Sequence, residues 1–213
     1  KGAIYAAEVE RARQEGRWSA AVPHEPALPV DTDWDLGIGD NMAIWFSQST
    51  RSGEVRLFDY YEGSGEGFPH YAQVLASKRY VYGKHWAPHD IQVRELGSGR
   101  SRLEVAASLG IRFEVTPRLH GGGAGEVEEG IHAARMLFSR CWFDAEKCKA
   151  GREALMHYRR DYNQRINEFK ASPVHDFASH ASDAFRGLAV RHQAPQEARE
   201  KRTANIPREW AWT

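Results

Sequence analysis

Three aspartates in this sequence stand where strands or helices can bring their carboxylates together. Asp35 lies at the end of a predicted strand, just before Gly37, and Asp90 follows a short strand that ends at Pro88. Asp183 lies on a predicted helix among small residues, which let a helix sit close to a sheet. Carboxylates held close together repel one another, and divalent cations relieve that repulsion. Two cations roughly 3.5–4 Å apart stabilise the attacking and leaving oxygens of phosphodiester cleavage, so this set predicts a metal-dependent nuclease.

Each of these residues also has a simpler interpretation. An aspartate taken alone is typical of a turn or a cap, and Asp40 either binds a metal through water or caps the turn after the first strand. Asp33 shares a strand face with Asp35, one step further from the strand end. His180, three residues before Asp183 on nearly the same helix face, can position water or a phosphate, or it can bond the helix N-terminus. His89 has the same two interpretations.

Periodicity and turn residues indicate the elements that must position these side chains. Strands are predicted over residues 30–36, 42–46, 54–61, 85–88 and 111–115. Helices are predicted over residues 2–16, 68–77, 101–109, 127–140, 145–158 and 179–190, and residues 159–170 are either a helix extension or a ribbon. A meander followed by crossovers indicates the α/β class, with a mixed β-sheet flanked by helices.

Composition excludes several classes of protein. The 213 residues carry no formal net charge, which argues against DNA binding by bulk charge but permits a local basic patch. No apolar run is long enough to span a membrane, and residues 1–12 do not form a signal peptide. Cys141 and Cys148 are too few for a disulfide framework and are predicted to be reduced thiols. No phosphate-binding loop with a lysine is present, so ATP hydrolysis is not expected from these residues.

Basic residues flank the second acid and are predicted to bind the phosphate backbone of DNA without reading its sequence. They are Lys78, Arg79, Lys84, Arg94, Arg100 and Arg102. A second candidate patch holds Arg159, Arg160 and Arg165. The alternative for both groups is a solvated charged surface. The glycine-rich residues 120–125 form either a mobile flap near DNA or a loose connection.

Four segments together resemble the C-terminal nuclease domain of the large terminase subunit of tailed double-stranded DNA bacteriophages. They are TDWDLGIGDNMAIW (32–45), FDYYE (58–62), APHD (87–90) and SHASDAFR (179–186), and the first and last are the most specific. The resemblance runs over residues 1–190. It implies an RNase H-like fold, similar to that of retroviral integrases, and a two-metal endonuclease that cuts concatemeric viral DNA around packaging.

The resemblance also implies roles for individual residues. Asp35 matches the acid of the first strand, and Asp183 matches the acid of the helix. The spacing of 90 − 35 = 55 residues favours Asp90 as the middle acid, because two strands and a helix fit between them. Glu62, which precedes that helix, remains the alternative. The implied cofactors are two divalent cations, Mg²⁺ or Mn²⁺, and the sequence does not choose between them.

The same resemblance predicts the surroundings of the nuclease. Residues 1–29 are expected to be a linker helix and proline-rich connection from an ATPase motor, residues 30–190 the nuclease domain, and residues 191–213 a flexible tail. The expected partners are double-stranded DNA, that motor, the small terminase subunit and the portal, in the cytoplasm of an infected bacterium. Two alternatives remain, namely a junction resolvase or integrase-like nuclease with the same acids, and a catalytically silent module that docks on DNA or the portal.

Overall fold

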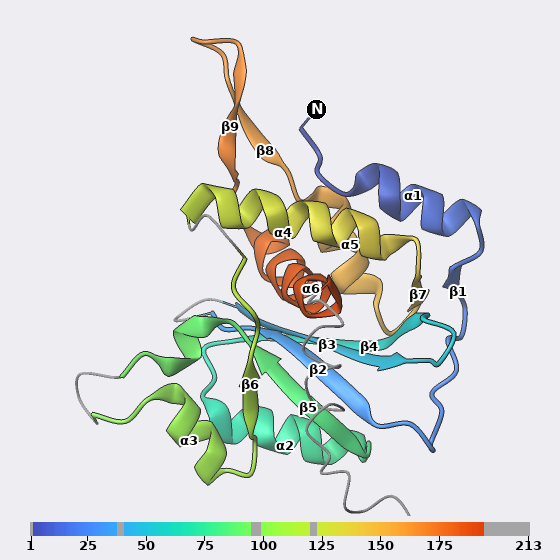
Figure 1. The fold of residues 1–213 in the computed structure, drawn as a ribbon, viewed down its shortest axis with the longest axis vertical. Coiled ribbons are helices and arrows are strands. Elements are labelled where there is room, and N and C mark those ends of the chain that lie inside the picture. Colours follow the sequence, from blue (N-terminus) through green and yellow to red (C-terminus); the bar gives the residue numbers. More distant parts are fainter. Residues whose placement is uncertain (1, 38–40, 95–98, 120–122, 194–213) are drawn as a thin grey trace, which may run out of the picture.

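The molecule is built around a β-sheet with helices on both faces (Figure 1). The computed structural model describes residues 2–37, 41–94, 99–119 and 123–193. The strands of the main sheet are β1 (Trp18–Ser19), β2 (Val30–Asp35), β3 (Asn41–Ser49), β4 (Val55–Ser64), β5 (Tyr82–Ala87), β6 (Phe113–Val115) and β7 (Cys141–Asp144). Within these described strands the order is β1-β7-β4-β3-β2-β5-β6. Strand β3 is antiparallel to β2 and β4, and the other neighbours are parallel, so the predicted mixed sheet is confirmed.

The helices lie in two layers (Figure 1). They are α1 (Ala6–Gln14), α2 (Phe68–Lys78), α3 (Arg102–Ser108), α4 (Gly123–Phe138), α5 (Lys149–His157), α6 (Phe177–Gln193) and the short 3-10 helix η1 (His89–Gln92). Helices α1, α4, α5 and α6 cover one face of the sheet, and α2 and α3 lie on the other. Among the described helices, none is both long enough and apolar enough to cross a membrane.

Alternation along the central strands divides the core into two clusters. Ile44 of β3 packs with the cluster on the α2 side, and its neighbour Trp45 packs with the cluster on the α6 side, both fully buried. Burial of each such side chain contributes about 1.5–3 kcal/mol to folding. Helix α5 can approach Trp45 because it carries Gly151, where an added Cβ would lie 2.4 Å from the indole ring. Cys141 and Cys148 are buried free thiols.

Two strands are absent from the sequence prediction. The four residues of β7 lie between two helices, and their alternation is too short to separate them from the helical pattern around them. Strand β1 has two residues and exists because it pairs with β7, with Trp18 opposite Phe143. Both strands depend on tertiary contacts rather than on local propensity.

The predicted boundaries of the domain do not coincide with breaks in packing. Tyr5 and Val9, in the predicted connection, are buried in the same cluster as Phe185 of α6. At the other end α6 continues past Val190 to Gln193, and the side chain of Arg191 is buried, so residues 191–193 are helical rather than part of a tail. Residues 194–213 lie outside the described residues, as do residues 120–122 of the predicted flap, whereas Gly123 begins α4.

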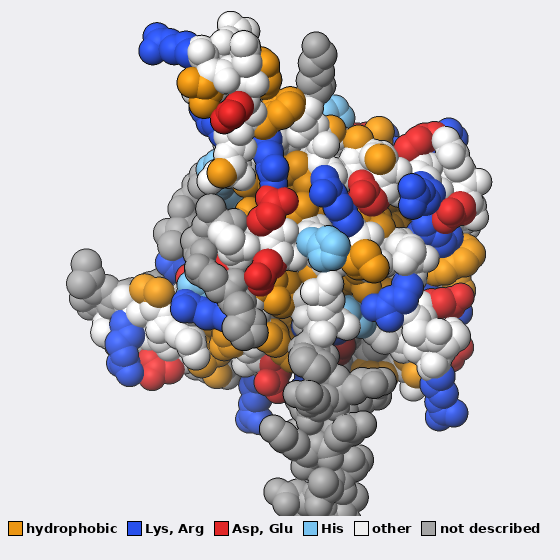
Figure 2. Space-filling model, turned by 45° about the horizontal axis from the view of Figure 1, so that its top comes forward, with side chains coloured by type: hydrophobic (Ala, Val, Ile, Leu, Met, Phe, Trp, Pro, Cys, Tyr) orange, Lys and Arg blue, Asp and Glu red, His pale blue; other side chains and the backbone are white. Residues whose placement is uncertain are grey.

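The ambiguous segment after α5 forms a two-stranded antiparallel ribbon. Strand β8 (Arg160–Asn163) pairs with β9 (Glu168–Pro173), and the ribbon projects from the body of the fold (Figures 1 and 2). Hydrophobic side chains remain exposed along it, including Tyr162, Ile166 and Phe169. Of the two conformations that the sequence left open for residues 159–170, the structure therefore has the ribbon.

Candidate active site

The carboxyl ends of β2 and β5 lie side by side and carry two of the three predicted acids. The strands are parallel, with Asp33 opposite Trp86. Asp35 is the last residue of β2, and β5 leads through Pro88 into η1, which contains Asp90. The carboxyl ends of adjacent parallel strands form the edge of an α/β sheet at which ligands usually bind.

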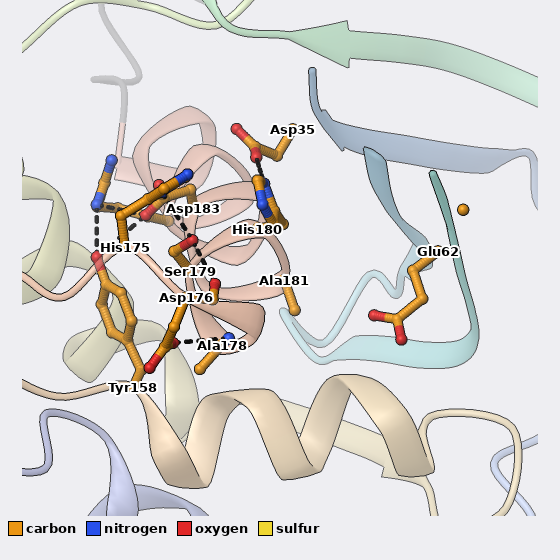
Figure 3. Close-up of polar contacts among 12 residues, drawn as sticks. Asp35, Glu62, Tyr158, His175, Asp176, Ala178, Ser179, His180, Ala181 and Asp183 are labelled. Carbon is orange, nitrogen blue, oxygen red and sulfur yellow. Dashed lines mark hydrogen bonds and ion pairs between the residues drawn. The ribbon is translucent and has the colours of Figure 1, made fainter. Parts of the chain in front are cut away.

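Helix α6 crosses this edge and brings the third acid to it (Figure 3). His180, near the start of the helix, contacts Asp35, and Arg191, near its end, contacts Asp33. The helix therefore runs opposite in direction to β2. Asp183 lies one turn after His180 on this helix, so it faces the same end of the strand.

Asp35 is held by a histidine in a poorly hydrated position. The Nδ1 atom of His180 lies 2.9 Å from Oδ2 of Asp35. Burial raises the pKa of Asp35, the hydrogen bond from His180 lowers it, and the charges of Asp183 and Asp90 raise it again. Asp183 and Asp90 therefore both lie within electrostatic reach of Asp35.

Asp183 is held by two groups from different helices. Its Oδ1 accepts hydrogen bonds from the hydroxyl of Tyr158 at 3.0 Å and from a guanidinium nitrogen of Arg186 at 2.8 Å. The same nitrogen of Arg186 donates to the Tyr158 oxygen at 3.1 Å, which closes a triangle of three side chains. Gly130 of α4 makes room for this arrangement, because a Cβ there would lie 2.5 Å from Cδ of Arg186.

Asp90 has an oxygen with no hydrogen-bond partner. Its Oδ1 is buried, and no group among the described residues donates to it. A buried carboxylate oxygen without a partner is costly unless an ion or water satisfies it. This atom therefore fits a metal ligand better than a simple cap.

A cavity of about 260 Å³ opens beside these acids. Asp35 and Asp183 line it, together with His89, Arg118 and Arg186. The remaining walls are largely apolar. Its volume is small, but its open side and its three carboxylates, those of Asp35, Asp183 and Glu126, suit a phosphate group with bound cations more than an apolar ligand.

Solved structures share this fold at low sequence identity. The large terminase of one thermophilic bacteriophage matches with a TM-score of 0.63 and 15% identity, over 88% of this chain and 44% of that one. The nuclease domain of the P22 large terminase matches with a TM-score of 0.61 and 19% identity, over 81% of this chain and 85% of that one. The large terminase nuclease of the thermophilic phage G20c, solved with bound cobalt, matches with a TM-score of 0.56 and 13% identity, over 91% of this chain and 97% of that one. This chain has the fold of a large-terminase nuclease domain.

The likeness is one of fold, since no protein-family model and no curated protein matches the sequence. The chain spans less than half of the first of these terminases but nearly all of the G20c nuclease. The predicted RNase H-like class is thereby confirmed.

The terminase-nuclease fold separates Glu62 from the other acids. Asp35 pairs with Ala43 on β3, and Ala43 pairs with Glu62 on β4. These residues share a face of the sheet, with Asp35 and Glu62 two strand spacings apart, about 9.5 Å. Glu62 is exposed and accepts a hydrogen bond from the Tyr60 hydroxyl at 2.8 Å. It stands apart from the hydrogen-bonded group in Figure 3.

The acids do not form a closed metal cage. Over the described residues, no three His, Cys, Asp or Glu side chains already surround a common point closely enough to hold an ion. Asp35 and Asp183 each direct one oxygen to a protein partner, so a shared cation would bind the other oxygen of each. Asp40, the other candidate ligand, lies outside the described residues.

Half of the predicted DNA contacts lie away from this site. Lys78 forms a 2.5 Å ion pair with Asp59, and Arg79 follows it at the end of α2. The backbone N–H of Lys84 donates to Asp31, at the amino end of β2. The structure therefore does not bring Lys78, Arg79 and Lys84 to Asp35, because α2 returns the chain to the opposite end of that strand.

The other three predicted contacts follow η1. Arg94 donates to the carbonyl of Gly99, Arg100 donates to the carbonyl of Glu104, and Arg102 is the half-buried first residue of α3. Arg94 and Arg100 are exposed on the segment that leads away from Asp90. A role for them in DNA binding stays a prediction.

In the second predicted patch, ion pairs engage two of the three arginines. Arg159 pairs with Asp176 at 2.5 Å, and Arg160 pairs with Glu128. Arg165 lies on the turn of the projecting ribbon, where it is exposed. It is therefore the member of this patch best placed to meet a partner.

Four residues of the site are missing from the sequence prediction, and one of them is Glu126, a third carboxylate that lines the cavity. Arg186 lies one turn after Asp183, and that helical spacing was a signal that could have identified it. Tyr158 belongs to the end of α5, and Arg118 follows β6, so neither has a sequence relation to the acids. Only the folded structure brings these two residues to Asp183 and the cavity.

Proposed function

We propose that this chain is a metal-dependent endonuclease that cleaves double-stranded viral DNA during genome packaging. The observation that carries the proposal is the meeting of Asp35, Asp90 and Asp183 at one sheet edge of a terminase-nuclease fold. Two carboxylates within electrostatic reach of Asp35, one of them with a buried unpartnered oxygen, favour divalent cations as the counter-charge.

Asp35, Asp90 and Asp183 would hold two divalent cations, Mg²⁺ or Mn²⁺. Two such ions supply charge stabilisation for the attacking and leaving oxygens of a phosphodiester. Hard oxygen ligands suit these metals, and the G20c nuclease of similar fold was solved with bound cobalt. Glu62 is the less favoured alternative to Asp90, because its exposed carboxylate lies two strands from Asp35.

The protein's own groups would orient the acids and the DNA. His180 holds one oxygen of Asp35, and Arg186 and Tyr158 hold one oxygen of Asp183. Arg118 is exposed at the cavity and can bind a DNA phosphate next to the scissile one. His89, also exposed there, is placed to exchange a proton with water or a phosphate oxygen.

The biological setting is part of the same proposal. The first of the matched terminase chains extends well beyond the region that it shares with this chain. We expect this nuclease to act in the cytoplasm of an infected bacterium, alongside an ATPase motor, a small terminase subunit and the portal.

The test is cleavage of supercoiled plasmid by the purified chain in Mg²⁺ or Mn²⁺, with EDTA as the metal-free control. Asp35→Asn and Asp183→Asn should reduce cleavage to the EDTA background while circular dichroism stays unchanged. Asp161→Asn, an exposed acid of β8 that pairs with Lys170, is the matched control and should retain full activity. Activity retained in both site variants would refute this assignment of the acids.

Two other outcomes would redirect the proposal. Preferential cutting of four-way junctions over linear duplex would favour a resolvase with the same acids. DNA or portal binding without cleavage at any Mn²⁺ concentration would favour a catalytically silent docking module.

A further inference from the structure

One of the proposed metal ligands is held by a tyrosine that the chemistry itself does not require. The hydroxyl of Tyr158 donates to Oδ1 of Asp183 at 3.0 Å (Figure 3). Tyr158 is 2% exposed, whereas the side chain of Asp183 is 30% exposed, so the bond reaches from the core to the edge of the cavity. Arg186 donates hydrogen bonds to both residues, so Oδ1 of Asp183 accepts two hydrogen bonds, one from Tyr158 and one from Arg186.

The N-terminal arm, residues 2–5, in turn holds Tyr158. The ring of Tyr5 stacks on the Tyr158 ring, with centroids 5.5 Å apart and planes 23° apart. The N–H of Ile4 donates to the Tyr158 carbonyl at 2.8 Å, and Arg160 N–H donates to the Gly2 carbonyl at 3.0 Å. The arm is therefore bonded to the chain at Tyr158 and two residues beyond it.

The arm is itself anchored to the body. Arg135 of α4 donates to the Ile4 carbonyl at 3.0 Å and lies 3.5 Å from the Glu8 carboxylate. Tyr5 also contacts the rings of Phe138 and Phe185. Movement of Tyr158 away from Asp183 would thus require disruption of packing that involves α1, α4 and α6.

We propose that Tyr158 is a positioning residue for the metal ligand Asp183, and that the N-terminal arm fixes Tyr158 in that role. This inference rests on the proposed function. With Oδ1 held, the carboxylate is already oriented and loses less rotational freedom when it binds a cation. Partners of this kind commonly contribute about 10–100-fold to metal affinity. Tyr158 carries no charge, so its effect is separable from the charge of Arg186, which opposes a nearby cation.

Adjacent tyrosines in the stack provide a matched pair of variants. Tyr158→Phe removes the hydroxyl that bonds Asp183 and keeps the ring. Tyr5→Phe removes a hydroxyl from an equally buried ring, and that hydroxyl has no hydrogen-bond partner among the described residues. Both changes delete one oxygen from the same aromatic stack, so effects on general packing should be similar.

Mn²⁺ binding to the metal-free protein is the first measurement, by calorimetry or by electron paramagnetic resonance of free Mn²⁺. We expect Tyr158→Phe to weaken Mn²⁺ binding about tenfold and Tyr5→Phe to leave it within twofold of wild type. Equal affinities in the two variants would overturn the positioning role and reduce Tyr158 to a core residue.

A second measurement separates this inference from the proposed function. In crystals of metal-free protein, the Asp183 carboxylate should keep one orientation in wild type and Tyr5→Phe and adopt others in Tyr158→Phe. Absence of Mn²⁺ binding by the wild-type protein would refute the proposed function. An unchanged Asp183 orientation in Tyr158→Phe would refute the positioning role of Tyr158 alone.

The contribution of the arm is tested at Gly2. This glycine has φ of +84°, and an added Cβ would lie 2.7 Å from the Arg160 carbonyl oxygen, so Gly2→Ala should displace the arm. Gly16→Ala is the control, because Gly16 has φ of +72° with no atom near the added Cβ. Weaker Mn²⁺ binding by at least threefold in Gly2→Ala alone supports the arm's role, and unchanged binding in both variants overturns it.

Discussion

Removal of the Asp33 carboxylate should destabilise this protein more than removal of an exposed acid. The side chain of Asp33 is 1% exposed and receives two bonds from Arg191, at 2.6 and 2.9 Å. The side chain of Arg191 is 8% exposed, so loss of its partner leaves a buried guanidinium with incomplete compensation. Loss of one member of a buried pair costs about 3–5 kcal/mol.

The surroundings of the pair place the expected loss at the lower end of that range. Arg191 keeps a 3.4 Å ion pair with Asp31, which is partly exposed, and a hydrogen bond to Ser47 at 3.2 Å. We therefore expect Asp33→Asn to lower the free energy of unfolding by about 3 kcal/mol. For a chain of this size that corresponds to a melting temperature roughly 6–12 °C lower.

A double-mutant cycle tests the physical reason for this loss. Burial raises the pKa of Asp33 and the charge of Arg191 opposes that rise, whereas Asp33 raises the pKa of Arg191 despite burial, so each charge depends on the other to offset its dehydration. The double variant Asp33→Asn/Arg191→Met should therefore lose less free energy of unfolding than the two single variants lose together. We expect the difference, the coupling energy, to be about 1–3 kcal/mol.

Urea unfolding followed by tryptophan fluorescence measures all four proteins, with Asp161→Asn as the exposed control. The reasoning fails if Asp33→Asn loses no more stability than the control, or if the two single losses simply add. Additive losses would mean that the guanidinium finds adequate hydration or other partners without Asp33.

Three further predictions concern the site. The pKa of Asp35 is raised in the folded state, so the fold loses stability as pH rises through that pKa. Metal-free Asp35→Asn should therefore resist urea better than wild type at pH 7, and as well as wild type near pH 4, the ordinary range of the group. Lower stability of the variant at pH 7 would contradict this. Arg118→Gln should weaken DNA binding and reduce the slope of log affinity against log salt by about 1, at unchanged melting temperature. Asp90→Asn should abolish Mn²⁺-dependent cleavage and Glu62→Gln should preserve it, and the reverse pattern would exchange their assignments.

Much of the fold was predictable because its elements carry strong local signals. The alternating residues of β2, the apolar run of β3 and the apolar stripe of α6 agree in sequence and structure. Local propensity and tertiary packing favour the same conformation in these segments. The mixed sheet followed from their order.

The missed strands and site residues have a common physical cause. Strand β7 has four residues, and its stability comes from pairing with β4 and β1 rather than from its own composition. Tyr158 reaches Asp183 from another helix, 25 residues earlier in the chain. Contacts of this kind are properties of the packed chain and leave no periodic pattern in the sequence.

The choice between Asp90 and Glu62 shows how topology adds to spacing. Glu62 lies near the end of β4 and Asp90 follows β5, and both strands run in the same direction as β2. Both acids therefore lie toward the carboxyl end of β2. Strand β3 separates Glu62 from Asp35, whereas α2 carries the chain across the sheet and places β5 directly beside β2. The crossover helix therefore favours Asp90, and sequence separation alone is a weaker guide.

A cluster of carboxylates is an unfavourable feature that the rest of the fold must offset. Burial and neighbouring charges raise the pKa of Asp35, so its ionised form opposes folding. Close by, the Asp33–Arg191 pair joins β2 to α6 two residues from Asp35 and fixes these two elements relative to each other. Because the same two elements carry the pair and the proposed ligands, the structure can hold Asp35 and Asp183 near one another without relying on the metal to assemble them.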